Sequence, residues 1–463
     1  MKTVNYENGE LRNKRFQTNR RGGKTVGTGR KMASRRFDVA EAEIDQTDEH
    51  QYFEGRAYGR PTPTTDEELV RVGPGTKGGE LLRRYWQPFA LADEATSKPQ
   101  HVSVLDECLV LYRDGDGNPG LLYPRCMHRG TDLIYGKVEQ TGIRCCYHGW
   151  VFDSQGHCLE IPTETNEKLR QRIRQPWYPV MEKFGLLFTY MGPPELQPGF
   201  PTFSLEDDLG ESERIVSYRS DSGPNGPHPK LSAASDYNWW QMYDNWMDPF
   251  HVCVLHYSIN GPQFSPSLGI LPEVDFRETA DGVISIQKRV RAEGPVQQRI
   301  SQVIMPNMNC TAGVTDEELG VAGIGWTVPI DDTSYVMFGL VRIDRENPVS
   351  PPDIPMLQDH WGPDHGKPFA EWTLEDHQQW QTDYVAQKGQ GDITSHSEEH
   401  LMAGDKGTAL SRRFFRRQAE LVASGQQPIG ATPNVSYRVE ILGGNALLDR
   451  ETGECVAGYA ATT

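Results

Sequence analysis

Short segments of alternating apolar residues fill the second quarter of the chain and predict antiparallel strands. The expected strands are residues 101–105, 108–112, 121–123 and 186–190, and Asp114-Gly115-Asp116-Gly117-Asn118 is a strong hairpin signal between two of them. Gly192-Pro193-Pro194 then marks a domain boundary. Up to that point we expect a small antiparallel β-sandwich, a fold that holds its loops rigidly.

Longer elements are expected beyond residue 195. Residues 236–257 and 373–387 have helical patterns, and they bracket two expected strands, 283–290 and 335–342. The predicted fold class is therefore α+β, with a β-sandwich domain at 86–194 and a domain at 195–463 in which helices flank an antiparallel sheet.

A short helical region is expected before both domains. Thr65 and Glu68 form a capping box that predicts a helix start, and residues 65–85 are expected to pack on the second domain. Gly73 to Gly78 matches G-x-G-x-x-G by letter. A dinucleotide-binding loop must follow a strand, however, and this segment follows a helix-like one and contains Pro74.

Charge is distributed unevenly along the chain. The net charge of the 463 residues is −17, yet residues 1–36 contain eleven Lys and Arg and only two acidic residues, Glu7 and Glu10. Because this segment has no apolar stripe, residues 1–64 are expected to form a flexible tail, basic and then acidic. The acidic remainder argues against a nucleic-acid partner, since phosphate contacts need a basic surface.

Hydropathy and cysteine spacing predict a cytoplasmic protein without a membrane partner. No apolar run approaches the ~18 residues of a spanning helix, and the N-terminus lacks the apolar region of a secretory signal. The eight cysteines show no disulfide-framework spacing, as expected in a reducing compartment.

Two cysteines and two histidines form the pattern C-x-H-x16-C-x2-H. They are Cys126, His128, Cys145 and His148, so each of two short loops offers one thiolate and one imidazole. This arrangement suits a [2Fe–2S] cluster in which one iron binds both sulfurs and the other binds both nitrogens. A single zinc ion is the alternative, although zinc motifs usually pair Cys with Cys and His with His.

The residues around these ligands, Pro124 to Gly130 and Cys145 to Trp150, resemble the ligand loops of Rieske domains in ring-hydroxylating oxygenases. The resemblance implies a cluster that accepts electrons more readily than an all-thiolate ferredoxin cluster. Since no nucleotide-binding fingerprint is present, electrons from NAD(P)H would arrive through a separate flavin- or ferredoxin-type reductase. Arg125, Arg129, Lys137 and Arg144 lie around the ligands, and they either dock such an acidic partner or simply solvate the rim of the site.

A second group of candidate ligands lies in the expected helix 236–257. His251 and His256 are five residues apart, which places them ~140° apart on an ideal α-helix. To bind one metal they need a helix end or a π-type distortion, and Pro249 offers a break. Taken alone, two ordinary buried histidines are the simpler explanation.

The same segment is similar to the D/E-x3-D-x2-H-x4-H signature of Rieske non-haem iron oxygenase catalytic (α) subunits, here Asp244, Asp248, His251 and His256. Other segments look most like the phthalate dioxygenase group. The resemblance implies a helix-grip-like catalytic domain in which two histidines and a later carboxylate bind mononuclear Fe(II), with O2 as co-substrate. Asp376, Asp383 and Asp392 are the carboxylate candidates, and similarity to the family's helix favours Asp383.

The resemblance also implies a role for Asp248 and an assembly. In the family this aspartate bridges an iron-ligand histidine and a cluster histidine of the neighbouring subunit, which would be His148, so a homotrimer or a multiple of trimers without a β subunit is expected. The implied activity is hydroxylation or O-demethylation of a small aromatic compound, such as an aromatic acid or methoxy-aromatic. Apolar residues of the ligand helix could line its pocket or belong to the core: Met242, Trp246, Met247 and Phe250. An electron-transfer protein with a partner-binding second domain is the alternative.

Overall fold

The computed structural model describes residues 60–207, 209–220, 222–223, 226–227, 234–259, 264–313, 319–321, 323–344 and 371–458. The chain divides into two units, residues 1–61 and 62–463, and the second contains the elements below. The predicted tail falls almost entirely outside the described residues. Within them, no helix is long and apolar enough to cross a membrane.

Two short helices open the second unit. α1 (Glu67–Val70) is capped by Asp66, whose side chain accepts a hydrogen bond from Glu68 N, so the predicted Thr65 cap was wrong by one residue. The Thr65 hydroxyl instead lies 3.0 Å from His396 Nδ1. α2 (Lys77–Leu82) begins at the G-x-G-x-x-G segment and is preceded by a helix rather than a strand, which confirms that this segment is no dinucleotide loop.

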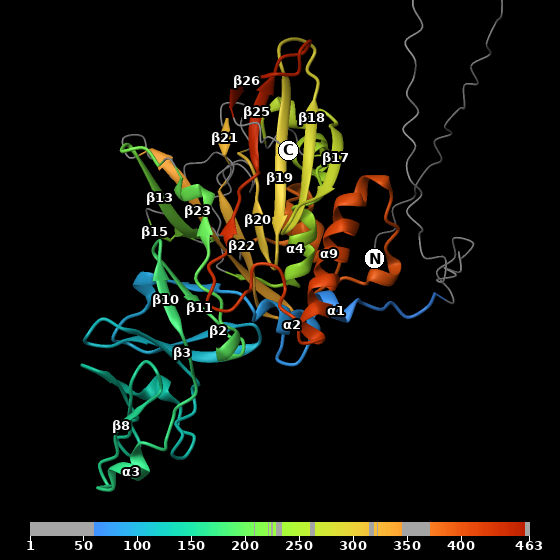
Figure 1. The fold of residues 1–463 in the computed structure, drawn as a ribbon. Coiled ribbons are helices and arrows are strands. Elements are labelled where there is room, and N and C mark those ends of the chain that lie inside the picture. The colour runs from blue at the N-terminus through green and yellow to red at the C-terminus, as the bar shows by residue number, and fades with distance from the viewer. Residues whose placement is uncertain are drawn as a thin grey trace, which may run out of the picture. The chain divides into compact units, whose positions relative to one another are not determined.

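Three small antiparallel sheets follow (Figure 1). The first pairs β1 (Gln87–Leu91), β11 (Leu186–Thr189) and β10 (Val180–Lys183). The second contains β2 (Gln100–Val104), β3 (Glu107–Arg113), β4 (Pro119–Leu122) and β9 (Trp177–Tyr178). The third contains β5 (Lys137–Glu139), β6 (Gly142–Arg144), β7 (Val151–Phe152) and β8 (Cys158–Glu160). The predicted strands and the hairpin at residues 114–118 are confirmed, with bounds shifted by one or two residues.

A large sheet makes up most of the remaining chain. The strand order among the described residues is β15 (Gly226–Pro227), β14 (Ser222–Gly223), β13 (Glu213–Arg219), β23 (Ser334–Asp344), β22 (Ile324–Asp331), β20 (Met308–Cys310), β19 (Val296–Ile304), β18 (Gly282–Arg289) and β17 (Glu273–Glu278). Four strands pair off this path: β16 (Ala234–Ser235), β21 (Gly320–Val321), β25 (Gly444–Leu448) and β26 (Cys455–Gly458). A separate parallel pair joins β12 (Thr202–Phe203) to β24 (Arg438–Val439).

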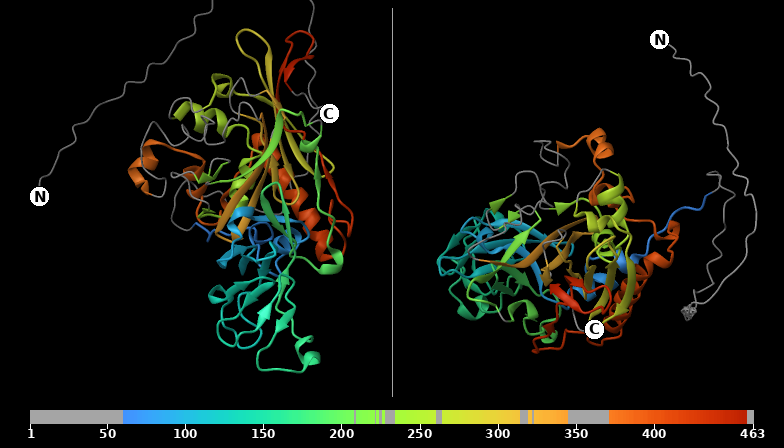
Figure 2. Two further views of the ribbon diagram at one scale, coloured as in Figure 1. Left: turned by 90° about the vertical axis from the view of Figure 1, so that its left-hand side faces the viewer. Right: turned by 90° about the horizontal axis from the view of Figure 1, so that it is seen from above.

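Helices accompany the large sheet, which confirms the α+β class. They are α4 (Trp239–Asn245), α5 (His251–Cys253), the π-helix η5 (Val254–Ile259), α7 (Leu374–Gln379), α8 (Asp383–Lys388) and α9 (Lys406–Ala423). Shorter helices are η1 (Ala92–Glu94), η2 (Leu133–Tyr135), α3 (Glu167–Arg170), η3 (Pro194–Leu196), η4 (Ser204–Glu206), η6 (Pro266–Gly269), η9 (His396–Glu398) and η10 (Ala403–Asp405). Figure 2 shows the large sheet with α9 and other helices of the second half of the chain from two further directions.

Both long helices expected from the sequence are broken, and the breaks position ligands. Residues 236–257 contain α4, a turn through Asp248-Pro249, α5 and the π-helix. Residues 373–387 divide into α7 and α8 at Trp380 to Thr382, so Asp383 is the first residue of α8 rather than an interior one.

One hydrophobic core ties the small sheets to the large one. It includes Leu81 of α2, Phe188 of β11, Trp240 of α4, Phe338 of β23 and Phe415 of α9, all almost completely buried. A second, smaller core lies between the β2–β4 and β5–β8 sheets and contains the two motif cysteines.

Candidate metal centres

Two loops of matching hydrogen-bond pattern carry the cysteine–histidine motif. In the first, Cys126 N donates to Thr131 O at 2.9 Å, and Gly130 N donates to Cys126 O at 2.8 Å. In the second, Cys145 N donates to Trp150 O at 2.8 Å, and Gly149 N donates to Cys145 O at 3.0 Å. Each loop is closed by these two hydrogen bonds, and the closure needs a residue in the left-handed conformation four positions after the cysteine. Gly130 and Gly149 occupy these positions with φ of +77° and +74°.

The thiols and imidazoles of this motif lie in different surroundings. Cys126 and Cys145 are 2 % and 3 % exposed, whereas the two histidines are half-buried. The rings of His128 and His148 lie 4.4 Å apart, centroid to centroid. Burial, together with the adjacent Cys145, raises the pKa of the Cys126 thiol to about 12, so the thiolate form at this site needs a bound cation to stabilise it.

The spacing of these four side chains fits two metal ions better than one. A single tetrahedral ion requires all four ligand atoms close around it. Among the described residues, the group of three or more candidate ligand atoms within 4.8 Å of one another is a different one, considered below. His128 Nδ1 is buried without a hydrogen-bond partner in the protein, as expected of an atom that binds an exogenous group.

Two contacts that the motif does not predict hold the first loop and its histidine. Trp150 stacks on His128 with centroids 4.5 Å apart and planes 7° from parallel. Gln175, which is fully buried, accepts a hydrogen bond from Met127 N at 3.0 Å and donates to Tyr123 O and Arg125 O at 2.7 and 3.0 Å. Trp150 lies two residues after His148, but Gln175 gives no signal in the sequence because it is remote from the loop.

The basic residues around the motif do not form one uniform surface. Arg144 forms ion pairs with Glu139 and Glu160 at 2.7 Å and donates to Gly149 O at 2.8 Å, so it braces the second loop. Arg125, Arg129 and Lys137 are exposed, and Arg129 lies over the Tyr147 ring at 5.7 Å. Of the four predicted docking residues, Arg144 is therefore occupied within the protein.

The second candidate centre is built where the ligand helix is broken. Asp248 Oδ1 accepts hydrogen bonds from Phe250 N at 2.9 Å and His251 N at 3.3 Å, which orders the turn between the end of α4 at Asn245 and the start of α5 at His251. The chain then widens into the π-helix Val254–Ile259. The predicted π-type distortion is confirmed, and it allows His251 and His256 to approach with ring centroids 5.3 Å apart.

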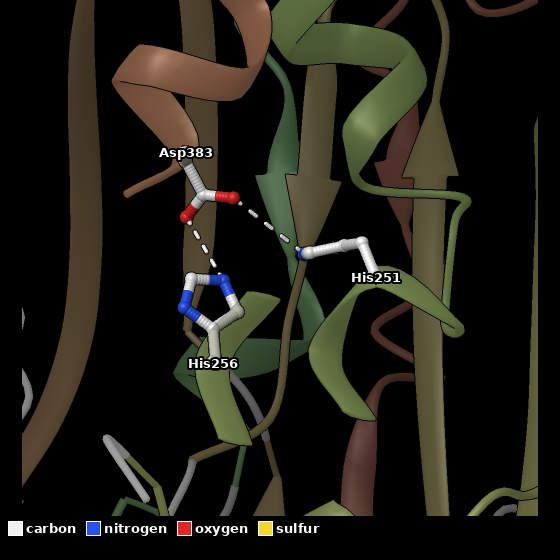
Figure 3. A group of neighbouring side chains, drawn as sticks. All are labelled: His251, His256 and Asp383. Atoms are coloured by element: carbon white, nitrogen blue, oxygen red, sulfur yellow. Dashed lines mark ion pairs between the residues drawn. The ribbon is translucent and has the colours of Figure 1, made fainter. Parts of the chain in front are cut away.

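Asp383 faces both histidines from the start of α8 (Figure 3). Its Oδ1 lies 3.6 Å from His251 Nε2, and its Oδ2 lies 3.3 Å from His256 Nε2. Ligand atoms of these three side chains lie within 4.8 Å of one another. Two imidazoles and one carboxylate on one side of a point are the ligand set of non-haem Fe(II) sites.

The other two candidate carboxylates have different partners. Asp376 closes the capping box of α7, accepting from Thr373 N and Oγ1 at 2.7 Å. Asp392 is 69 % exposed and pairs with Lys388 at 2.6 Å. The helix break between α7 and α8 thus separates side chains that an unbroken helix would have placed on one face.

Two polar groups position the three clustered side chains. Asp248 Oδ2 lies 3.5 Å from His251 Nδ1, and although burial opposes its ionisation, His251 holds the pKa of Asp248 below its ordinary value. Asn245 Nδ2 donates to Asp383 Oδ1 at 3.1 Å. Asn245, three residues before Asp248, gives no signal of this role in the sequence.

The apolar residues of the ligand helix are mostly core. Met242 and Met247 are 7 % and 0 % exposed, and a Cβ added at Gly407 of α9 would meet Met247 O at 2.7 Å. Trp246 is half-buried and donates from Nε1 to Thr327 Oγ1 of β22 at 3.4 Å.

The chain matches one family model and is similar over most of its length to several known proteins. Residues 85–181 match the family model of the Rieske [2Fe-2S] domain. The chain is 41 % identical over 413 residues to the phenoxybenzoate dioxygenase subunit alpha of Ectopseudomonas oleovorans, covering 87 % of this chain and 97 % of that protein.

Two further relatives are oxygenase subunits with different substrates in their names. The tert-butanol monooxygenase / tert-amyl alcohol desaturase oxygenase subunit of Aquincola tertiaricarbonis is 34 % identical, and the match covers 76 % of each chain. The 5,5'-dehydrodivanillate O-demethylase oxygenase subunit of a Sphingobium species is 33 % identical, covering 78 % of this chain and 81 % of that protein.

Proposed function

Because the chain belongs to the Rieske non-haem iron oxygenases, as a catalytic (α) subunit, we propose that His251, His256 and Asp383 bind a mononuclear Fe(II). The single observation that carries this assignment is the convergence of these three side chains from segments more than a hundred residues apart. Likewise, we assign the Rieske [2Fe–2S] cluster to four ligands: Cys126, His128, Cys145 and His148.

We propose that the chain has two main domains and that the protein is cytoplasmic. We place the Rieske domain at 86–194 and the catalytic domain at 195–463, with the helices of 65–85 packed on the latter. In support, Phe415 of α9 lies against Gly78 of α2. None of the eight cysteines, all of them described, forms a disulfide, which supports a location in the cytoplasm.

When bound, the cluster would supply single electrons and the ferrous ion would activate O2. The chain's own residues prepare these sites. Asn245 holds Asp383 Oδ1, which leaves Oδ2 toward His256 and fixes the orientation of the carboxylate. Asp248 orients His251 through Nδ1 so that Nε2 faces Asp383.

Asp248 is also our candidate for the connection between the two centres. Its side chain is 34 % exposed, although Oδ1 accepts a hydrogen bond from Phe250 N and Oδ2 faces His251. An imidazole from a neighbouring subunit can therefore reach it, and the half-buried His148 of that subunit is the proposed donor. This arrangement requires a head-to-tail ring, which we propose to be a homotrimer or a multiple of trimers without a β subunit.

The proposed substrate is a small aromatic acid or methoxy-aromatic compound, with electrons from NAD(P)H delivered by a separate flavin- or ferredoxin-type reductase. The 41 % identity to a phenoxybenzoate dioxygenase supports an aromatic acid, and the dehydrodivanillate O-demethylase supports attack on a methoxy carbon. The relative named for tert-butanol defines the competing class, a small aliphatic alcohol.

Oxygen consumption with a reductase tests this proposal. The panel comprises phenoxybenzoate, phthalate, benzoate, methoxybenzoates and tert-butanol, with products scored as diols, phenols or formaldehyde. Substrate-dependent O2 uptake is expected with at least one aromatic acid. Uptake with tert-butanol alone would overturn the substrate class, and no uptake by wild-type protein with a full complement of iron would overturn the proposed activity on small aromatics.

A further inference from the structure

The side of the large sheet that faces the helices is unusually polar where β18 and β19 pair. Ser285 is opposite Ser301, Gln287 opposite Arg299, and Arg289 opposite Gln297. All six are buried. On the reverse side of the same strands, Ile284, Ile286 and Ile300 form an apolar cluster.

The contacts of these strands identify the polar side as the helix side. Ser285 is also opposite Phe276 of β17, and a Cβ added at Gly407 of α9 would lie 2.5 Å from the Phe276 ring. Figure 1 shows β17, β18 and β19 as neighbours with α9 beside them. A sheet packed on helices normally presents apolar side chains to them, so a polar row here indicates a role other than packing.

The row contains two cations, Arg299, which donates from Nη1 to Gly313 O, and Arg289, which is 0 % exposed. Its Nε donates to Ile270 O at 3.1 Å, and its Nη2 donates to Gln287 Oε1 at 3.1 Å. Gln287 Nε2 in turn lies 3.2 Å from Ser285 Oγ and 3.3 Å from Ser301 Oγ. The guanidinium is thus held in one orientation by neutral groups on two sides.

The charge of Arg289 lacks an anion among the described residues. Its Nη1 is buried and has no hydrogen-bond partner, and neither does Gln297 Oε1 on the opposite strand. Burial lowers the pKa of Arg289, and the neighbouring Cys253 thiol is the group that opposes this shift. A buried cation without an anion is destabilising unless a ligand completes the pair.

The position of Arg289 connects it to the proposed iron site. Cys253 belongs to α5, between His251 and His256 in the chain, and its Sγ donates to Ile270 O at 3.3 Å. Since Arg289 Nε donates to the same carbonyl, the guanidinium lies against the segment that carries both histidines. An anion paired with Arg289 would be held beside this segment.

We propose that Arg289 anchors the carboxylate of an aromatic acid substrate, with Gln287 and Gln297 beside it as neutral hydrogen-bonding partners. A guanidinium with a fixed orientation suits a planar carboxylate, which it binds through parallel N–H donors. The proposal rests on the proposed function, because it specifies which part of an aromatic acid the catalytic domain holds. A purely structural role, in which Arg289 only cross-links β18 to Ile270, predicts no preference for acids over neutral analogues.

Equilibrium binding to the holoenzyme tests this, with phenoxybenzoate and the neutral phenoxybenzyl alcohol as probes. Wild-type protein is expected to prefer the acid, and Arg289→Met should reduce this preference at least tenfold through weaker acid binding. Met fills a similar volume without a charge, so the variant should fold. Lys288→Gln is the matched control, since Lys288 is an exposed cation on the next position of the same strand and points to the other face.

A second variant keeps the test decisive if Arg289→Met does not fold. Arg289→Lys retains a charge and should keep a weakened preference for the acid. An acid preference in Arg289→Lys equal to that of the wild type and of the Lys288→Gln control would refute the need for a guanidinium, and an unchanged preference in Arg289→Met would refute the anchor. No acid preference in the wild type refutes it as well. Turnover of aromatic acids by the wild type in these cases would leave the proposed function standing.

Discussion

Gln175 makes the sharpest prediction about how the Rieske cluster is retained. The side chain is fully buried, and its three hydrogen bonds all go to the backbone of the first ligand loop and its approach: Met127 N, Tyr123 O and Arg125 O. Its backbone N donates to Gly156 O at 2.8 Å, next to the sheet that carries the second ligand loop. Gln175 therefore links the two halves of the cluster site.

The expected change in the free energy of loop opening follows from the hydrogen bonds that a substitution of Gln175 removes. Gln175→Leu has a similar volume but removes all three bonds, each worth about 1 kcal/mol net, so opening of the first loop should become easier by roughly 3 kcal/mol. At about 1.4 kcal/mol per factor of ten, the open population should rise on the order of 10²-fold.

The assay is the first-order loss of the visible absorbance of the cluster in the presence of a strong iron chelator. Cluster loss should be on the order of 10²-fold faster in Gln175→Leu than in wild type when loop opening limits access. Gln155→Leu is the control, since Gln155 is exposed in the turn between β7 and β8. Equal rates for Gln175→Leu, Gln155→Leu and wild type would refute the linking role.

Three further predictions concern the other groups of the two centres. Asp383→Asn should lose the mononuclear iron while keeping the cluster absorbance, whereas Asp376→Asn should keep the mononuclear iron. Loss of this iron in Asp376→Asn but not in Asp383→Asn would refute the ligand assignment. Arg129→Glu should slow reduction by the reductase and flatten its salt dependence in stopped-flow traces, and unchanged kinetics would remove Arg129 from the docking surface. The hydrogen bond from Arg144 holds the pKa of Glu139 below its ordinary value, so the stabilisation is present above the unfolded-state pKa and is lost as pH falls through the folded-state pKa. Glu139→Gln should therefore make cluster loss less dependent on pH in this acid range, and an unaltered acid limb would contradict the bracing role.

Local sequence patterns predicted the ligand loops and most strands because the physical requirements there are local. The cysteine–histidine spacing is confined to two loops whose closure depends on one glycine each, Gly130 and Gly149. The alternating strands of the small sheets likewise follow from residue types a few positions apart. The family resemblance added the role of the second motif, which spacing alone left open.

Features that depend on contacts between residues far apart in the sequence could not be predicted from local patterns. The break between α7 and α8 follows from no Gly or Pro at 380–382, and it determines which carboxylate faces the histidines. Gln175 acts on a loop about fifty residues away, and Asn245 acts on Asp383 from another helix. The buried charge of Arg289 looks in the sequence like any strand-end arginine, because burial depends on packing of the whole domain.

Mössbauer spectroscopy of protein enriched in ⁵⁷Fe tests the central claim most directly, because it distinguishes iron sites by their ligands. We predict three iron environments in wild type: a sulfur-ligated and a nitrogen-ligated iron of one cluster, and a separate high-spin ferrous ion. In His251→Ala the ferrous signal alone should disappear. A spectrum without the cluster pair, or a wild-type spectrum with the cluster and no third iron after anaerobic loading with Fe(II), would contradict the account.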